Sequence, residues 1–353
     1  MAAMSGRGGM SPQPAGRSAA LDFCRVLALG AIFVGHVWYE GWPLRITYAW
    51  HVPIFFILSG YLWRPGRELR QEWKRRWSSL VVPYIVWWFV VAAVSFVWAL
   101  TQGAVLGPYF YALAAWGGVG GYRPFTAFWF FPALTVAVLF LRLVQNRSRL
   151  LAWAVPVVAI MLCQVFTHVA QRLPLSALVG VGCALFILVG SELRRIRERV
   201  HAPIATGAAL LAVGALGVAV PGYEHLELKL ADFGTPAASV VAACLIACGL
   251  ILLSEGMFDR YWPGGGRYWT VLAQCATFVM LSQGLVLMMM RTPTTGGWLD
   301  FVLVVTVPYA LALATLPTRL SPWLHGREPL VWWRTGSAPV ISRGRYDSAR
   351  GSR

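Results

Sequence analysis

Apolar residues form ten runs along the chain, separated by short polar segments that hold most of the charges. A helix needs about 20 apolar residues to cross the hydrocarbon core of a bilayer. The pattern therefore predicts an all-α, polytopic integral membrane protein with about ten transmembrane helices. The run at 50–63 is short, so its helix starts earlier, tilts or is broken. The runs lie near 20–39, 50–63, 79–101, 125–144, 150–169, 174–191, 203–221, 236–254, 269–290 and 298–316.

Composition supports a chain whose surface mostly faces lipid. Of the 353 residues, 58% are hydrophobic and only 12% are charged, against about 25% charged in soluble domains. The net charge is +16, which in a soluble protein would suggest a nucleic-acid partner. Here the basic residues lie in loops between apolar runs, so membrane topology explains them and no nucleic-acid partner is expected.

The distribution of Lys and Arg predicts the orientation in the membrane. If the N-terminus is cytoplasmic, 25 of these residues fall in cytoplasmic segments and 5 in external loops, as the positive-inside rule requires. We therefore expect a multi-pass protein of the cell membrane with both termini in the cytoplasm. The expected organisation is a disordered Gly/Pro/Ser-rich tail at 1–19, a transmembrane domain at 20–316 and a basic cytoplasmic tail at 317–353.

The cysteines predict neither a disulfide nor a metal site. All six fall inside or at the edge of apolar runs, and the sequence has no CxxC pair or other metal-ligand spacing. They are Cys24, Cys163, Cys183, Cys244, Cys248 and Cys275.

The first apolar run contains two ionisable groups, which are costly in a membrane and usually functional. Arg25 precedes His36 by eleven residues, about 20° beyond three helical turns, so both lie on one face, about 16 Å apart along the axis. Asp22 lies one turn before Arg25 and can pair with it. The alternatives are an arginine that snorkels to the inner interface and a histidine hydrogen-bonded at the outer interface.

The second run begins with His51 near the outer surface and carries Ser59 and Gly60 deep in the membrane. Gly60 allows close approach of another helix, and Ser59 can hydrogen-bond across that contact. The basic stretch 64–76 follows; it is either a positive-inside signal or a site for the phosphates of an anionic cofactor. Two external loops, the acidic 222–235 and the aromatic 102–124, are either ordinary interfacial loops or contacts for a sugar.

Five motifs lie in about the first 135 residues. They are Leu21-Asp22-x-x-Arg25-x-Leu27-Ala28, Arg25 with His36, Pro53-x-Phe55-Phe56-x-x-Ser59-Gly60-Tyr61, Arg75-Arg76 before Pro83-Tyr84, and Phe128-Trp129-Phe130-Phe131-Pro132-Ala133-Leu134. On these motifs the segment from Leu21 to Tyr84, and with it about the first 135 residues, resembles the acyltransferase-3 family of bacterial membrane acyltransferases. The form with His51 just before Pro53 is most similar to the sugar O-acetylases of the fucose 4-O-acetylase type.

The chain departs from the resemblance in the ninth run. Family members often have a histidine there, whereas this chain has Ala276, Thr277, Met280 and Gln283. The departure puts in doubt a catalytic role near this helix and the standard acceptor.

The resemblance implies transfer of an acyl group, usually acetyl, from cytoplasmic acetyl-CoA or another acyl-CoA to a hydroxyl of an extracytoplasmic or lipid-linked glycan. His36 would be the general base or a transient acyl carrier. Arg25, with Arg75 and Arg76, would hold the donor's phosphates or polarise its thioester. His51 would orient the acceptor or assist His36, and Ser59 with Gly60 would shape the helix contact beside the donor.

Two other functions fit the sequence. One is an acyltransferase that tailors a secondary metabolite, such as a macrolide or glycosylated antibiotic. The other is a transporter of a small or lipid-linked solute, although the chain shows no internal repeat and no matching pair of broken helices. The sequence gives no oligomeric state.

Overall fold

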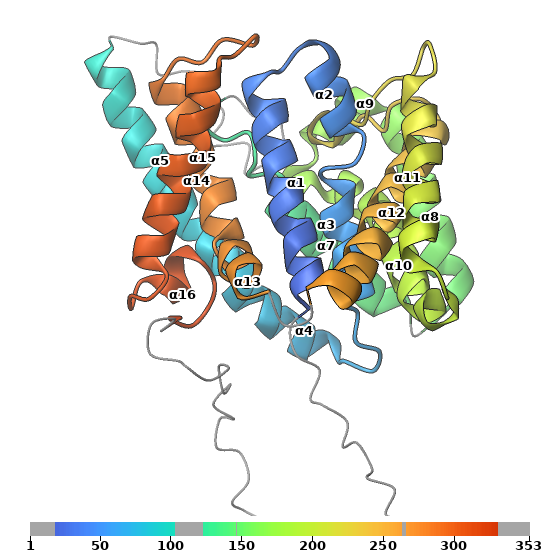
Figure 1. Ribbon diagram of the computed structural model, residues 1–353. Coiled ribbons are helices and arrows are strands. Elements are labelled where there is room, and N and C mark those ends of the chain that lie inside the picture. The colour runs from blue at the N-terminus through green and yellow to red at the C-terminus, as the bar shows by residue number, and fades with distance from the viewer. Residues whose placement is uncertain (1–17, 103–122, 146, 263–265, 331–353) are drawn as a thin grey trace, which may run out of the picture.

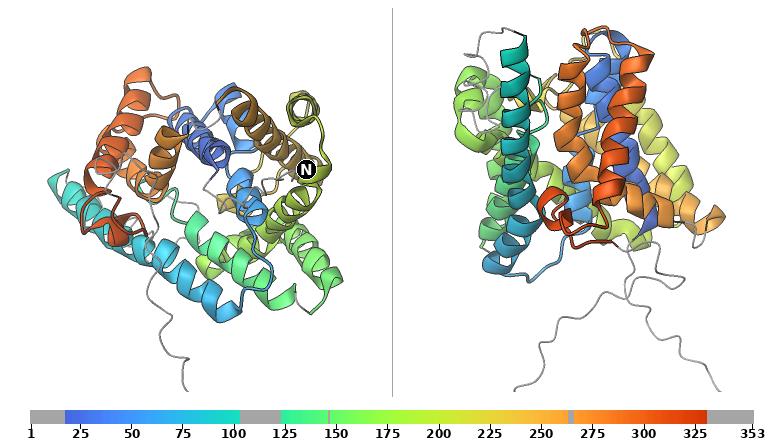
Figure 2. Two further views of the ribbon diagram at one scale, coloured as in Figure 1. Left: turned by 60° about the horizontal axis from the view of Figure 1, so that its bottom comes forward. Right: turned by 90° about the vertical axis from the view of Figure 1, so that its left-hand side faces the viewer.

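The computed structural model describes residues 18–102, 123–145, 147–262 and 266–330. Within these ranges every regular element is a helix, and the one strand-like pairing is an isolated bridge between Glu227 and Asp232. Figure 1 shows α4 and α16 at one end of the bundle and α2 and α9 at the other. In Figure 2, helices from the first and second halves of the chain surround a common centre.

The described helices follow one another along the chain. The α-helices are α1 (Ala19–Val37), α2 (Gly41–Tyr48), α3 (Pro53–Tyr61), α4 (Leu69–Arg76), α5 (Val82–Thr101), α7 (Phe130–Val144), α8 (Arg149–Val165), α9 (Thr167–Arg172), α10 (Ala177–Ile196), α11 (Pro203–Ala219), α12 (Ala238–Tyr261), α13 (Arg267–Gln274), α14 (Ala276–Met289), α15 (Trp298–Thr315) and α16 (Ser321–Leu324). A π-helical turn, Trp77–Val81, joins α4 to α5, and 3-10 turns occupy Pro174–Ser176, Arg197–Arg199 and Leu228–Leu230.

The number of membrane crossings is only partly settled. Every apolar run contains a helix, but only five helices in the described ranges are long and apolar enough to cross a bilayer by themselves. A sixth crossing is added if α13 and α14, bent by 56° at their junction, form one span. Helices α7, α8 and α11 are apolar but shorter. The count of ten and the cytoplasmic position of both termini therefore stay predictions.

The second apolar run contains a short helix. Helix α3 has nine residues, or about 13 Å of length, which is too short to cross the hydrocarbon core. Pro53 occupies its first turn, where a missing N–H costs nothing, and α2 precedes it as a separate helix. This run is therefore the broken form among the three alternatives.

Close packing of α3 against α10 depends on two glycines. A Cβ atom at Gly60 would lie 1.8 Å from the carbonyl oxygen of Ile187, and one at Gly190 would lie 1.9 Å from that of Ile57. The predicted role of Gly60 is thus confirmed, with α10 as the partner. The predicted bond of Ser59 across the contact is wrong, because its hydroxyl donates to the Phe55 carbonyl of its own helix at 2.9 Å.

Helix α1 lies between α12 and the C-terminal helices α13–α15, and contacts with α13 and with the segment around the start of α15 fix its two ends (Figure 1). Near its start, the Phe23 ring packs edge-on against Trp269 of α13, with centroids 4.8 Å apart. Past its end, the N–H of Tyr39 donates to the carbonyl of Thr294 at 2.7 Å, and Trp38 packs against Trp298. The positions of Arg25 and His36 relative to α13–α15 are thereby set.

Candidate active site

A cavity of about 340 Å³ opens beside α4 and gathers arginines from three parts of the chain. Arg25 comes from α1, Arg75 and Arg76 from α4, and Arg327 from the segment after α16. Ser59 of α3 also lines it. The volume lies within the range of ordinary ligand sites. The remaining lining is mainly apolar: Leu29, Phe55, Leu58, Leu62, Ser79, Leu80, Phe130, Phe131, Leu134, Ala273, Ala276, Thr277 and Met280.

Arg25 is held in this cavity by Asp22. The two side chains form an ion pair within one turn of α1, as the sequence predicted. The Asp22 side chain is fully buried, whereas that of Arg25 keeps 21% of its surface exposed. The carboxylate therefore restrains the guanidinium without covering it, and part of it remains accessible to an anionic ligand.

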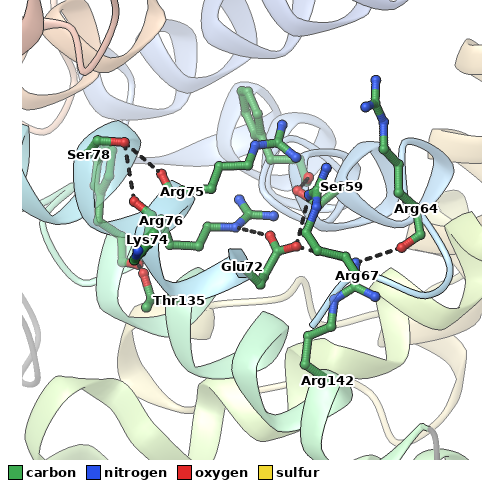
Figure 3. A network of polar contacts seen from close by, with 12 residues as sticks. Ser59, Arg64, Arg67, Glu72, Lys74, Arg75, Arg76, Ser78, Thr135 and Arg142 are labelled. Carbon is green, nitrogen blue, oxygen red and sulfur yellow. Dashed lines mark hydrogen bonds and ion pairs between the residues drawn. The ribbon is translucent and has the colours of Figure 1, made fainter. Parts of the chain in front are cut away.

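Glu72 organises the other arginines at this end of the protein (Figure 3). Its side chain is only 1% exposed and accepts from Arg67 at 2.9 Å, from Arg76 at 3.0 Å and from Arg142 at 3.3 Å. Arg142 also stacks over the ring of Trp63, 3.6 Å from its centroid. One carboxylate thus meets three guanidinium groups, and the network keeps an excess of positive charge.

Arg75 adds a further cation beside this network. Figure 3 shows its side chain next to Arg76, and no ion pair joins its guanidinium to any residue in the described ranges. The side chain is exposed and lines the 340 Å³ cavity. Arg75 therefore presents guanidinium N–H donors to this cavity.

A second, smaller cavity of about 30 Å³ holds the two predicted histidines, His36 of α1 and His51 from the segment before α3. The Nδ1 atom of His36 lies 3.3 Å from Oε1 of Gln283. The Nδ1 atom of His51 lies 2.7 Å from the carbonyl oxygen of Thr47, and since a carbonyl can only accept, this nitrogen carries the proton. The cavity has room for about one water or hydroxyl group.

The loop between α11 and α12 forms one wall of the smaller cavity through Leu226, Leu228 and Lys229. The Lys229 ammonium lies 3.3 Å from Glu227 and 4.3 Å from the ring centroid of Tyr39, whose hydroxyl donates to Glu227. Burial lowers the pKa of Lys229, and the charge of Glu227 partly offsets that effect. This loop is the acidic segment 222–235 that the sequence singled out.

Phe130 of α7 and Met280 of α14 line both cavities. Phe130 is packed edge-on against Phe56, with ring centroids 5.4 Å apart. Two side chains thus separate a cationic cavity from a cavity containing two imidazoles. This arrangement suits a reaction in which an anionic substrate and a proton acceptor meet from two sides.

A family model for an acyltransferase domain, that of the acyltransferase-3 family, matches residues 18–318. The chain belongs to the acyltransferase-3 family. It is a membrane O-acyltransferase with several apolar helices. No curated protein and no solved structure matches the chain.

The acyltransferase gathers its predicted site residues in two places. Arg25, Ser59, Arg75 and Arg76 line the larger cavity, whereas His36 and His51 line the smaller one. Asp22 supports Arg25, and Gly60 lies in the α3–α10 contact. Within the described ranges, no group of three His, Cys, Asp or Glu side chains could hold a metal ion. Most of the aromatic loop 102–124 lies outside the described residues.

Sequence reasoning missed three residues of this arrangement. Glu72 could have been noticed as an acidic residue inside a basic stretch. Gln283 was treated only as a missing histidine, although a buried amide in an apolar helix is itself a signal of a specific partner. Arg327 offered no signal, because its position in the site depends on how the segment after α16 folds back.

Proposed function

We propose that this acyltransferase moves an acyl group, in the simplest case acetyl, from a cytoplasmic acyl-CoA to a hydroxyl of an extracytoplasmic or lipid-linked glycan. The observation that supports the proposal most is the pair of cavities divided by Phe130 and Met280. One cavity offers guanidinium groups to a phosphate-rich donor, and the other offers an imidazole to a hydroxyl.

The larger cavity fits the donor by charge. The adenosine diphosphate part of an acyl-CoA is strongly anionic, and arginine binds phosphates through paired hydrogen bonds. Arg75 has no ion-pair partner in the described part of the chain, and Arg25 is partly exposed. Arg76 is held in place by Glu72. Together these groups would hold the phosphates, and the thioester would extend along Leu29 towards Met280.

The smaller cavity fits the chemical step. His36 would take the proton of the acceptor hydroxyl as its oxygen attacks the thioester carbonyl carbon. The new C–O ester bond forms, the C–S bond breaks, and the sulfur leaves as a thiolate that takes up a proton. His51 would orient the acceptor beside His36, because its Nδ1 is already bonded to Thr47. The acceptor would enter past the wall formed by Leu226, Leu228 and Lys229.

A sugar hydroxyl as acceptor is proposed from the resemblance to the fucose 4-O-acetylase type and from the predicted topology, which separates donor and acceptor. Tailoring of a secondary metabolite uses the same chemistry with another acceptor.

Mass spectrometry of glycans, lipids and secreted metabolites tests the proposal. Cells with the wild-type protein, the His36→Ala variant or a deletion are compared. We expect one product class to lose the mass of an acyl substitution in both mutants. A loss confined to a secreted metabolite would identify that metabolite, and not a glycan, as the acceptor. An unchanged acyl pattern would refute the proposal.

A further inference from the structure

Gln283 is the polar side chain that faces His36 from the ninth apolar run. It lies on α14, has no exposed surface, and its Oε1 is 3.3 Å from His36 Nδ1. A buried amide in an apolar helix is costly unless its hydrogen bonds are made. The helix that lacks the family's histidine therefore still supplies a polar partner to the proposed base.

The orientation of the Gln283 amide is set by its second contact. Its Nε2 lies 3.4 Å from the carbonyl oxygen of Met280. A flipped amide would place two acceptor oxygens against each other, so the oxygen faces His36 and the nitrogen faces Met280. An oxygen next to His36 can only accept, and the His36 nitrogen beside it must donate.

Contacts of Arg123 fix the position of α1 relative to α14. The guanidinium of Arg123 donates to the carbonyl of His36 at 2.8 Å, and also to the carbonyl of Thr292 just past the end of α14. Carbonyls in the last turn of a helix lack helical partners, so Arg123 both completes the end of α1 and joins it to α14. The meeting of His36 and Gln283 is thus built into the framework.

We propose that Gln283 is a positioning residue that keeps the proton of neutral His36 on Nδ1 and leaves the lone pair on Nε2. A general base needs that lone pair free, and a second group that fixes the tautomer is how an imidazole is prepared for proton transfer. The inference rests on the proposed function, because it gives His36 the role of base.

The charged and titratable groups around His36 come from four other segments. They are Lys229 from the loop before α12, His51 before α3, Arg123 before α7, and Tyr48 of α2, which lines the same cavity. None of them is an anion that would favour the imidazolium. A neutral amide beside Nδ1 therefore suits a base that rests uncharged, whereas a carboxylate at that place would favour the charged form.

Nitrogen-15 NMR of the full-length protein in lipid nanodiscs, labelled at histidine, tests the tautomer directly. The His36 signals are identified by their loss in the His36→Ala variant. We expect the wild-type ring to carry its proton on Nδ1 and the Gln283→Leu ring to populate the other tautomer. The Ser282→Ala variant is the matched control, because Ser282 is also buried in α14 but, in the described part of the chain, hydrogen-bonds within its own helix.

Transfer from labelled acetyl-CoA in membrane vesicles that contain the natural acceptor supplies the second readout. Gln283→Leu should lower kcat about 10- to 100-fold with little change in the KM for acetyl-CoA. Gln283→Glu keeps an acceptor oxygen, so it should retain more activity than Gln283→Leu, and the acidic limb of its pH profile should move to higher pH.

A wild-type ring protonated on Nε2, or a Gln283→Leu variant with unchanged tautomer and rate, would overturn the inference. An active His36→Ala variant would instead refute the base role. The NMR result does not depend on activity, so the two failures are distinguishable.

Discussion

Arg25 and His36 project from the same face of α1 into two different cavities. Eleven residues separate them, or about 16 Å along the helix axis. Arg25 shares its cavity with Arg75, Arg76 and Arg327, whereas His36 shares its cavity with His51. One helix thus joins the proposed donor site to the proposed base. The side chains between the two cavities, Phe130 and Met280, would limit the size of the acyl group that reaches His36.

Arg75 tests the donor site, because it is a cation of the larger cavity with no ion-pair partner in the described ranges. Arg75→Gln should raise the KM for acetyl-CoA about tenfold, since a hydrogen bond to a charged group contributes roughly 1.5–3 kcal/mol. The control is Arg70→Gln, an exposed arginine of α4 that does not line the cavity. Initial-rate kinetics at varied acetyl-CoA measure both variants, and equal KM values would place the phosphates elsewhere.

Glu72 tests the framework of the basic segment. Glu72→Gln leaves Arg67, Arg76 and Arg142 without their buried carboxylate, and breaking a buried ion pair costs about 3–5 kcal/mol. We expect a clearly lower unfolding temperature and weaker binding of acetyl-CoA. Glu68→Gln, at an exposed position just before α4, should leave both unchanged. Thermal unfolding in nanodiscs measures the effect, and equal midpoints for the two variants would mean that the network adds no stability.

Met280 tests the separation of the cavities. Met280→Ala removes a side chain that lines both, so longer acyl groups should be accepted, and the rate ratio of butyryl-CoA to acetyl-CoA should rise about tenfold. Truncation of a buried methionine costs about 2–5 kcal/mol, so folding is checked by gel filtration. Met280→Leu nearly conserves the volume and should keep the wild-type ratio. A folded Met280→Ala protein with the wild-type ratio would exclude Met280 from the acyl path.

His325 predicts a pH dependence of stability. The ring is buried after α16, stacks on Phe278 with centroids 5.1 Å apart and lies 3.0 Å from the Thr315 hydroxyl. Burial, with the nearby charge of Arg327, lowers its pKa from 6.5 to about 4. In the unfolded chain the ring takes up a proton as the pH falls through 6.5, whereas in the folded protein it does not. The contribution of His325 to the free energy of unfolding is therefore complete above pH 6.5 and declines as the pH falls towards 4.

The measurement compares thermal unfolding of the wild type and of His325→Phe at a pH above 6.5 and at one between 6.5 and 4. Between the two pH values, the free energy of unfolding of the wild type should fall by up to about 3 kcal/mol more than that of the variant, at 1.36 kcal/mol for each unit of pKa shift. An equal decrease in both proteins would show that burial does not lower the pKa of His325.

The sequence predicted local relationships better than distant ones. The spacing of Arg25 and His36 placed both on one face because helical geometry is regular, and the pairing of Asp22 with Arg25 followed from the same periodicity. Gly60 was recognised as a close-contact position, but its partner helix depends on packing that no local pattern encodes. The predicted bond of Ser59 failed because its hydroxyl can reach its own helix backbone.

The length of an apolar run also did not determine how the chain uses it. The run at 50–63 forms the short helix α3, packed closely against α10, and the run at 269–290 bends at Cys275. Gln283 faces His36 across a contact between α14 and α1, and just beyond it the N–H of Tyr39 bonds to the carbonyl of Thr294. Such contacts join residues more than 200 positions apart, and one sequence contains no local signal for them.

Label transfer in inside-out membrane vesicles tests the central claim most directly. Labelled acetyl-CoA is added to the face that is cytoplasmic in the cell, and its binding and the label in the acceptor fraction are measured for wild type and His36→Ala. We expect equal binding of acetyl-CoA, with label transfer reduced about 100-fold or more in His36→Ala. Equal transfer by both proteins, or movement of a solute without consumption of acetyl-CoA, would contradict acyl transfer through His36.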